Sequence, residues 1–138
     1  MFSRLVVLDT NVVVSAALKE DSNPARILSQ VLLGKISVLL CPSIHSEYQL
    51  VFSRPKFRVF HFPPIWFKEF LANCIYINKD PAAWPRSGPD KDDLVFLSLA
   101  AEQNACLVTG NLADFPETLR MGTEVVSPAQ YVAWLGQG

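Results

Sequence analysis

Short apolar runs alternate along the chain with longer segments in which apolar residues recur at helical spacing. This alternation is typical of a parallel sheet whose two faces are covered by helices. The runs that we expect to form strands lie at residues 5–8, 37–40, 75–77, 106–108 and 124–126. The pattern therefore predicts an α/β fold with a five-stranded parallel sheet.

Turn residues fall between these elements. Gly34 and Asn104 tolerate the left-handed backbone conformation, and each follows a helical segment just before a strand. Residues 79–89 are rich in proline and small side chains and predict a loop, with strands of the same sheet on both sides of it. A chain of 138 residues has room for one domain, so we expect residues 1–138 to form a single one. Prolines, which the first turn of a helix tolerates, stand where helices would begin: Pro42, Pro63, Pro64 and Pro128.

Composition limits the classes of function. The net charge is −1 and 18% of the residues are charged, which excludes a protein that coats nucleic acid through clustered Lys and Arg. The apolar stretches are too short for a signal peptide or a membrane span, and we expect a cytoplasmic protein with no membrane contact. Cys41, Cys74 and Cys106 form no CxxC pair and are expected to be buried, reduced thiols.

Asp9 is the first candidate for chemistry. It ends the apolar run LVVL and precedes the helical segment TNVVVSAAL, which places it at the carboxyl end of the first strand. Ligands of open α/β sheets bind at that edge. An Asp here can equally cap the helix that follows, and Asp9 alone does not decide between the two.

Glu47 lies within a stripe of apolar residues. In SIHSEYQLVFS the residues Ile44, Tyr48 and Val51 recur at helical spacing, and Glu47 falls on their face. A carboxylate on that face loses hydration unless it meets a cation or a hydrogen-bond donor. The alternative is a position at the edge of the stripe, from which the side chain reaches water.

A third group of acids begins the segment DKDDLVFLSLAAEQ. Asp93 aligns with the apolar face of this helix, and Asp90 lies one turn earlier on the same side. Asp92 points about 100° away and is expected to face solvent. The same residues suit a helix start, because Asp90 can cap the helix and acids are favourable at its positive end.

Together the three groups predict a metal site. Carboxylates gathered around one point repel one another unless they hold a hard cation such as Mg²⁺ or Mn²⁺, and such a site suits phosphodiester hydrolysis. The loop VTGNLADFP would bring Asn111 and Asp114 beside Asp9 if the first and fourth strands are neighbours. Otherwise it is an ordinary Gly-Asn turn.

Four segments resemble the motifs of the PIN-domain family in their usual order. They are LDTNVVVSAAL, PSIHSEYQLVFSRPKF, GPDKDDLVFLSLAAEQNACLVTGNLADF and VVSPAQYVAWL. These motif sequences are similar to those of bacterial and archaeal PIN proteins of the VapC group, the toxins of toxin–antitoxin systems. The resemblance covers nearly the whole chain.

The resemblance implies a three-layer α/β/α sandwich and an endoribonuclease that depends on Mg²⁺ or Mn²⁺. It also implies a homodimer and a small antitoxin partner. By position, Asp9, Glu47 and Asp93 match the three core acids, and Asp90 matches a frequent further acid. The other matched positions are polar: Thr10, Asn11, Ser15, Thr109, Asn111 and Asp114. Many relatives carry Asp where this chain has Asn111, which puts a second metal site in doubt.

The run SRPKFR supplies basic residues next to Phe57. Arg54, Lys56 and Arg58 could form an edge that binds the phosphates of single-stranded RNA while Phe57 stacks on a base. The alternative is a solvated helix end, with Arg54 near the negative end of the helix dipole.

Two other functions remain open from the sequence. A phosphatase of the haloacid-dehalogenase type shares LDT after a strand and a later pair of acids, but it needs Asp where this chain has Asn11. The second alternative function is that of a non-catalytic binding module with a PIN fold. The acids are complete, and Glu47 on an apolar face argues against that module.

Overall fold

The computed structural model describes residues 2–54 and 65–137. Its centre is a parallel sheet of five strands in the order β3-β2-β1-β4-β5. The strands are β1 Leu5–Leu8, β2 Ser37–Leu40, β3 Ile75–Tyr76, β4 Cys106–Val108 and β5 Val125–Val126. All five predicted strands are confirmed, although β3 and β5 are each one residue shorter than expected.

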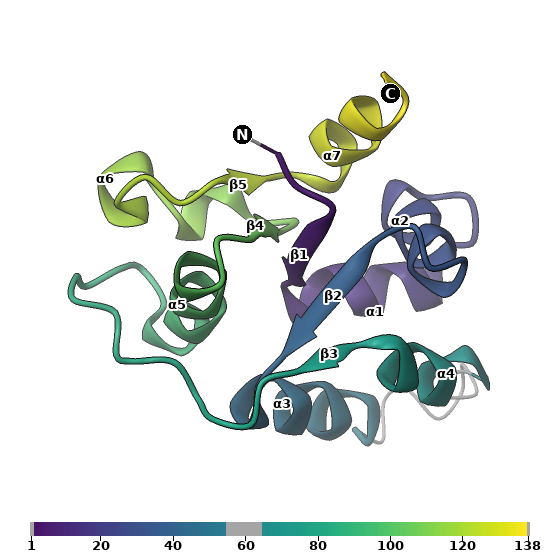
Figure 1. Ribbon diagram of the computed structural model, residues 1–138, viewed down its shortest axis with the longest axis horizontal. Helices are drawn as coiled ribbons and strands as arrows, with labels where there is room; N and C mark the ends of the chain where they lie inside the picture. Colours follow the sequence, from purple (N-terminus) through teal and green to yellow (C-terminus); the bar gives the residue numbers. More distant parts are fainter. Residues whose placement is uncertain (1, 55–64, 138) are drawn as a thin grey trace.

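Helices cover both faces of the sheet. Figure 1 shows α5 on the opposite side of the sheet from α2 and α7, which pack against each other. This arrangement confirms the predicted α/β/α sandwich. The helices are α1 Thr10–Leu18, α2 Asn23–Leu32, α3 Pro42–Phe52, α4 Ile65–Asn73, α5 Leu94–Glu102, α6 Glu117–Arg120 and α7 Pro128–Leu135, with 3₁₀ turns η2 Lys91–Asp93 and η3 Leu112–Asp114.

The predicted turn residues explain where these elements begin and end. Gly34 and Asn104 adopt φ values of 77° and 53°, the left-handed conformation expected before β2 and β4. Pro42 and Pro128 are the first residues of α3 and α7. Pro63 and Pro64 lie outside the described residues.

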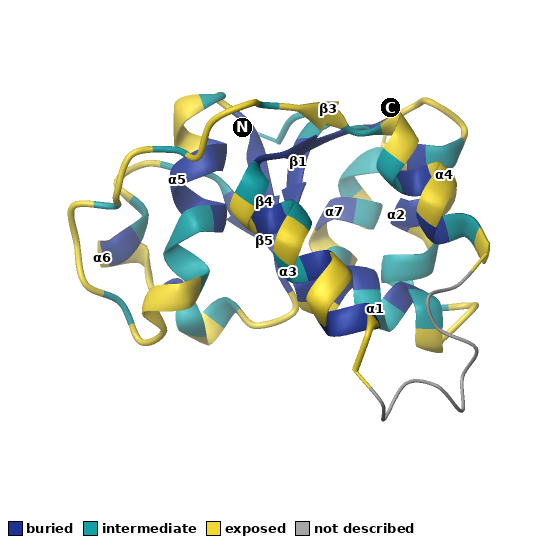
Figure 2. Ribbon diagram, turned by 90° about the horizontal axis from the view of Figure 1, so that it is seen from below, coloured by how far each residue is buried: buried dark blue, intermediate teal, exposed yellow. Residues whose placement is uncertain are grey.

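The core lies on both faces of the central strands. Val6, Val7 and Leu8 of β1 are completely buried, because a strand in the middle of a sandwich has a helix layer on each side. Figure 2 shows this buried centre and the exposed outer surfaces of the helices. Within the described part of the chain, no helix is long and apolar enough to cross a membrane.

The cysteines are free thiols, as expected. Cys41 and Cys106 are buried, whereas Cys74 is only half-buried. Burial raises the pKa of Cys74 and of Cys106 to about 12, so both thiols stay protonated and unreactive at neutral pH.

The sheet order places the candidate residues. β1 pairs with β2 on one side and with β4 on the other, so the chain leaves β1 and β4 toward opposite edges. The carboxyl ends of these two strands therefore border a switch point, where ligands bind in open α/β sheets.

Candidate acidic metal site

Acidic residues from four segments of the chain lie at the carboxyl edge of the sheet. Three of them, Asp90, Asp93 and Asp114, come within metal-ligand distance of one another, and among the described residues this group does not include Asp9 or Glu47. Asp9 follows β1, and Glu47 lies in α3. Asp90 precedes η2, Asp93 is its last residue, and Asp114 is the last residue of η3. The parallel strands deliver these segments to one edge, although they are up to about a hundred residues apart in sequence. The sequence hypothesis had named the same acids.

Asp9 is buried in the wall of the site, with 5% of its surface exposed. It stands at the N-cap position of α1, but its side chain makes no regular capping hydrogen bond. Its Oδ2 instead accepts from the Thr109 hydroxyl at 2.8 Å and from Asn11 Nδ2 at 3.4 Å. The carboxylate is therefore held across the β1–β4 junction.

Burial raises the pKa of Asp9 above its ordinary value. The Thr109 hydroxyl and the nearby N–H groups lower it in part, and the charge of Glu47 adds to the rise. Asp9 thus loses hydration without gaining a cationic partner among the described residues.

The loop after β4 is tied to the start of α1. The Thr109 hydroxyl, fully buried, also accepts from Asn111 N at 3.1 Å, and Gly110 N donates to Asn11 Oδ1 at 3.1 Å. A Cβ atom at Gly110 would lie 3.2 Å from Asn11 Oδ1, so glycine suits this close approach. The loop is therefore more than an ordinary Gly-Asn turn.

Glu47 is half-buried beside the fully buried Ile44 and Tyr48. Its carboxylate accepts a hydrogen bond from the Thr10 hydroxyl, which supplies the donor that the sequence argument required. Its charge contributes to the raised pKa of Asp9, so the two carboxylates are neighbours.

Among the described residues, Asp90, Asp93 and Asp114 form a close group of acids. One carboxylate oxygen from each lies within 4.8 Å of the others. Asp90 also caps η2, because its Oδ1 accepts from Asp92 N at 3.0 Å. Asp92 is exposed, as expected. Asp90 therefore caps η2 and also faces the other two acids, so the helix-start interpretation is confirmed and the metal-ligand interpretation stays a prediction.

Asp114 is a member of the acidic cluster, whereas the sequence indicated only a supporting role. It was expected as a supporting polar residue, yet it turns toward Asp90 and Asp93. Asn111 Nδ2 donates to Asp114 Oδ2 at 2.8 Å and holds it there. The spacing of Asn111 and Asp114 across one 3₁₀ turn is the sequence signal for this pairing.

Asp93 is where these charges converge. Partial burial raises the pKa of Asp93 to about 7, helped by the charge of Asp9, by a hydrogen bond with Asp114, and by the charges of Asp90 and Asp114. Such crowding is relieved by a proton or by a cation. Because carboxylate oxygens dominate the donor set, the residues fit a hard divalent cation.

The remaining predicted residues lie elsewhere or are not described. Ser15 is half-buried in the second turn of α1, and within residues 2–54 and 65–137 no side-chain hydrogen bond links it to the acids. Arg54 is exposed just after α3. Lys56 and Arg58 lie outside the described residues, so the proposed basic edge stays a prediction.

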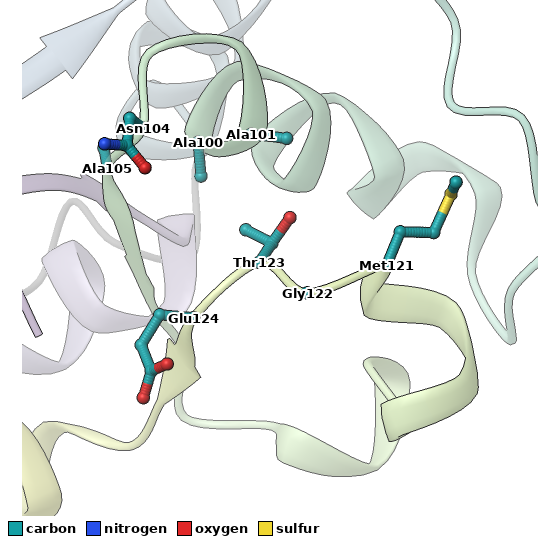
Figure 3. Close-up of a pocket in the computed structure, with 8 residues that line it drawn as sticks. All are labelled: Ala100, Ala101, Asn104, Ala105, Met121, Gly122, Thr123 and Glu124. Carbon is teal, nitrogen blue, oxygen red and sulfur yellow. The ribbon is translucent and has the colours of Figure 1, made fainter. Parts of the chain in front are cut away.

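Another pocket lies at the opposite edge of the sheet. Figure 3 shows it between the end of α5 and the segment that leads into β5. Its lining includes Asn104, Met121, Thr123 and Glu124, which precede β4 and β5 and so mark the amino ends of these strands. It contains none of the predicted acids.

Comparison with known families decides the class of protein. The model of the PIN domain matches residues 5–113, which is most of the chain. The chain belongs to the PIN-domain family. This membership confirms the resemblance seen in the sequence and speaks against the haloacid-dehalogenase type of phosphatase.

A solved structure agrees with this membership. The chain is similar to one in the crystal structure of VapBC2 from Rickettsia felis bound to a DNA fragment from their promoter, with a TM-score of 0.61 and 19% identity. The match covers 89% of this chain and 98% of the other. At that identity the likeness shows the fold. No curated protein matched the chain.

Proposed function

We propose that this protein is a Mg²⁺- or Mn²⁺-dependent endoribonuclease that hydrolyses RNA phosphodiester bonds. The observation that carries the proposal is the clustering of Asp90, Asp93 and Asp114 beside the buried Asp9. Carboxylates at this density destabilise a fold unless they serve a bound cation. Membership of the PIN-domain family supports the same conclusion.

Asp9, Glu47 and Asp93 are the proposed catalytic residues, and with Asp90 they are the proposed metal ligands. Asp114 joins them because its carboxylate lies in the same cluster. A divalent cation bound here would supply Lewis-acid chemistry, which lowers the pKa of an attacking water and offsets charge on the leaving oxygen.

Polar neighbours hold the ligands in place. The hydroxyl groups of Thr109 and Thr10 donate to Asp9 and Glu47, and the Asn111 amide donates to Asp114. Donors of this kind fix carboxylate orientation and leave the other oxygen lone pairs for the metal. Thr10, Thr109 and Asn111 are therefore proposed as positioning residues, with Asn11 beside them.

The proposed biological role is that of a toxin neutralised by a small antitoxin protein. The likeness to a chain of the VapBC2 structure supports such a partner. We also propose a homodimer, as the resemblance implies. The proposed site of action is the cytoplasm, where an RNA substrate would be available. Expression of the chain should arrest growth, and co-expression of a small neighbouring gene should relieve the arrest.

Cleavage of a mixed RNA panel tests the activity. We expect cleavage with Mn²⁺ or Mg²⁺, none with EDTA, and none by an Asp93→Asn variant that is folded. Metal binding without cleavage of any RNA would indicate a non-catalytic module. Cleavage that EDTA leaves unchanged would contradict the metal mechanism.

A further inference from the structure

The loop between β3 and α5, residues 79–89, has no role in the site described so far. Figure 1 shows it passing around the outside of α5, and in Figure 2 most of it is exposed. Side-chain hydrogen bonds nevertheless fasten it. Ala82 N donates to the Glu102 carboxylate at 2.6 Å, Ala82 O accepts from the Ser98 hydroxyl at 2.5 Å, and Trp84 Nε1 donates to Leu119 O at 2.9 Å. An exposed loop held in this way forms a defined wall.

A hollow lies between this wall and α5. Residues 81–84 line one side, and Lys91, Leu94, Val95 and Ser98 line the other. We call it the Trp84 hollow. Its volume is about 230 Å³, below the roughly 300–1,000 Å³ of pockets that hold drug-sized ligands. That size suits one base and excludes a folded oligonucleotide.

The Trp84 hollow adjoins the acidic site through a second hollow. The second one is lined by Ser43, Glu47, Asp92 and others, and it shares Lys91 and Val95 with the first. Glu47 is a proposed metal ligand. A strand whose scissile phosphate lies at the acids would therefore reach Lys91 and then the Trp84 hollow.

The two hollows differ in charge. Glu47 and Asp92 line the second, whereas the residues lining the Trp84 hollow include no acid. Lys91 stands at their boundary, and no acidic side chain among the described residues lies within ion-pair distance of it. An exposed lysine without an acidic partner is available for a phosphate, and an aromatic wall next to it is available for a base.

We propose that the Trp84 hollow is a nucleotide subsite for single-stranded RNA, in which Lys91 contacts a phosphate and the Trp84 wall receives the adjacent base. This inference rests on the proposed function and adds a recognition site to it. Such a subsite would bind RNA through one lysine and one aromatic pocket and would not need a strongly basic surface. This agrees with the net charge of −1.

Lys91 is tested by binding of fluorescently labelled single-stranded RNA in Mg²⁺, with Asp93→Asn present in every protein so that the RNA stays intact. Lys91→Ala should weaken binding about tenfold, because a hydrogen bond to a charged group is lost. It should also lower the dependence of log affinity on log salt by about one unit. Lys91→Arg should restore most of the affinity. Lys35→Ala removes an exposed lysine just before β2, at the amino edge, and should change neither quantity.

The base pocket is tested by filling it. Trp84 also packs against the core, so Trp84→Ala could unfold the protein. Ala83→Leu instead occupies the hollow and leaves the hydrogen bonds of the loop intact. It should weaken binding of normal RNA several-fold, and an abasic nucleotide at the register of the hollow should abolish the difference from the parent protein. Ala129→Leu, at an exposed position of α7, is the matched control.

The outcomes separate the two proposals. Normal binding by Lys91→Ala and Ala83→Leu, with RNA cleavage by the wild-type protein, would overturn the subsite alone. Weakened binding by both variants, without RNA cleavage by the wild-type protein, would support the subsite and overturn the nuclease. Failure of the Asp93→Asn parent and of the wild-type protein to bind any single-stranded RNA would overturn both.

Discussion

The two edges of the sheet differ in how closely acidic side chains approach one another. At the amino edge, Asn104 and Gly122 adopt positive φ values and shape the pocket of Figure 3 from turns and small side chains. At the carboxyl edge, Asp9, Asp93 and Asp114 crowd together, and the pKa of Asp93 rises to about 7. The amino edge is built from ordinary turns, whereas the carboxyl edge brings like charges close together, which costs stability. Local destabilisation of this kind is characteristic of functional sites.

The largest expected effect is loss of activity on changing the acids. Asp9→Asn should reduce RNA cleavage at least about a hundredfold while leaving the fold intact, because a charge is lost from the metal ligands. Glu124→Gln, at the amino edge, should leave the rate within about twofold of wild type. Rates are measured under identical Mn²⁺ conditions, with circular dichroism to verify folding. Unimpaired cleavage by Asp9→Asn would show that the wrong edge has been assigned.

The second effect is stabilisation by metal. At a hundredfold excess over the Kd, Mg²⁺ or Mn²⁺ should raise the melting temperature by about 5–10 °C, since the ion binds the native site and not the unfolded chain. Asp93→Asn should raise the melting temperature in EDTA and shrink the shift caused by metal. A melting curve that millimolar metal leaves unchanged would favour the non-catalytic module.

The third effect is a pH dependence of stability without metal. In the unfolded chain Asp93 ionises near 3.8, and in the folded protein its pKa is about 7. Between these values the native state binds more protons, so the free energy of unfolding should fall as pH rises from about 4 to 7. The destabilisation is absent below this window and complete above it. Urea unfolding in EDTA should show this fall, and Asp93→Asn should reduce it. A flat profile in the wild-type protein would contradict the crowding.

Most of the fold could be predicted from the sequence, because strands buried on both faces appear as continuous runs of apolar residues. Val6, Val7 and Leu8 form an unbroken apolar run, and Gly34 and Asn104 mark where helices end. Asp9 and Glu47 stand out in the sequence for a similar reason, since each interrupts an apolar pattern, and their role as metal ligands stays a prediction.

Other parts of the site depend on contacts that no local pattern contains. Asn111 and Asp114 pair within one local turn, but the position of Asp114 beside Asp90 and Asp93 joins two segments that are separate in sequence. The loop at residues 79–89 becomes a wall because Ser98 and Glu102 of α5 bind its backbone. These contacts join segments whose relative positions only the folded chain determines.

The smallest expected effect concerns Asn111 and a second metal. We expect one well-occupied metal, with a second bound weakly unless substrate phosphate completes its shell. Asn111→Asp should strengthen the second site, because it replaces the amide donor beside Asp114 with another carboxylate. Asp114→Asn serves as the control and should weaken metal binding. Calorimetric titration with Mn²⁺ measures both. Two tight sites in the wild-type protein without RNA would contradict the expectation.

The position of a bound metal would decide whether the acids at the carboxyl edge form a metal site. Crystals of the wild-type protein soaked in Mn²⁺ should show an anomalous difference peak within coordination distance of Asp93, with Asp9, Glu47, Asp90 or Asp114 completing the protein ligands. The same peak should be weak or missing in Asp93→Asn. A peak only at the amino edge, or none at saturating Mn²⁺, would contradict the account.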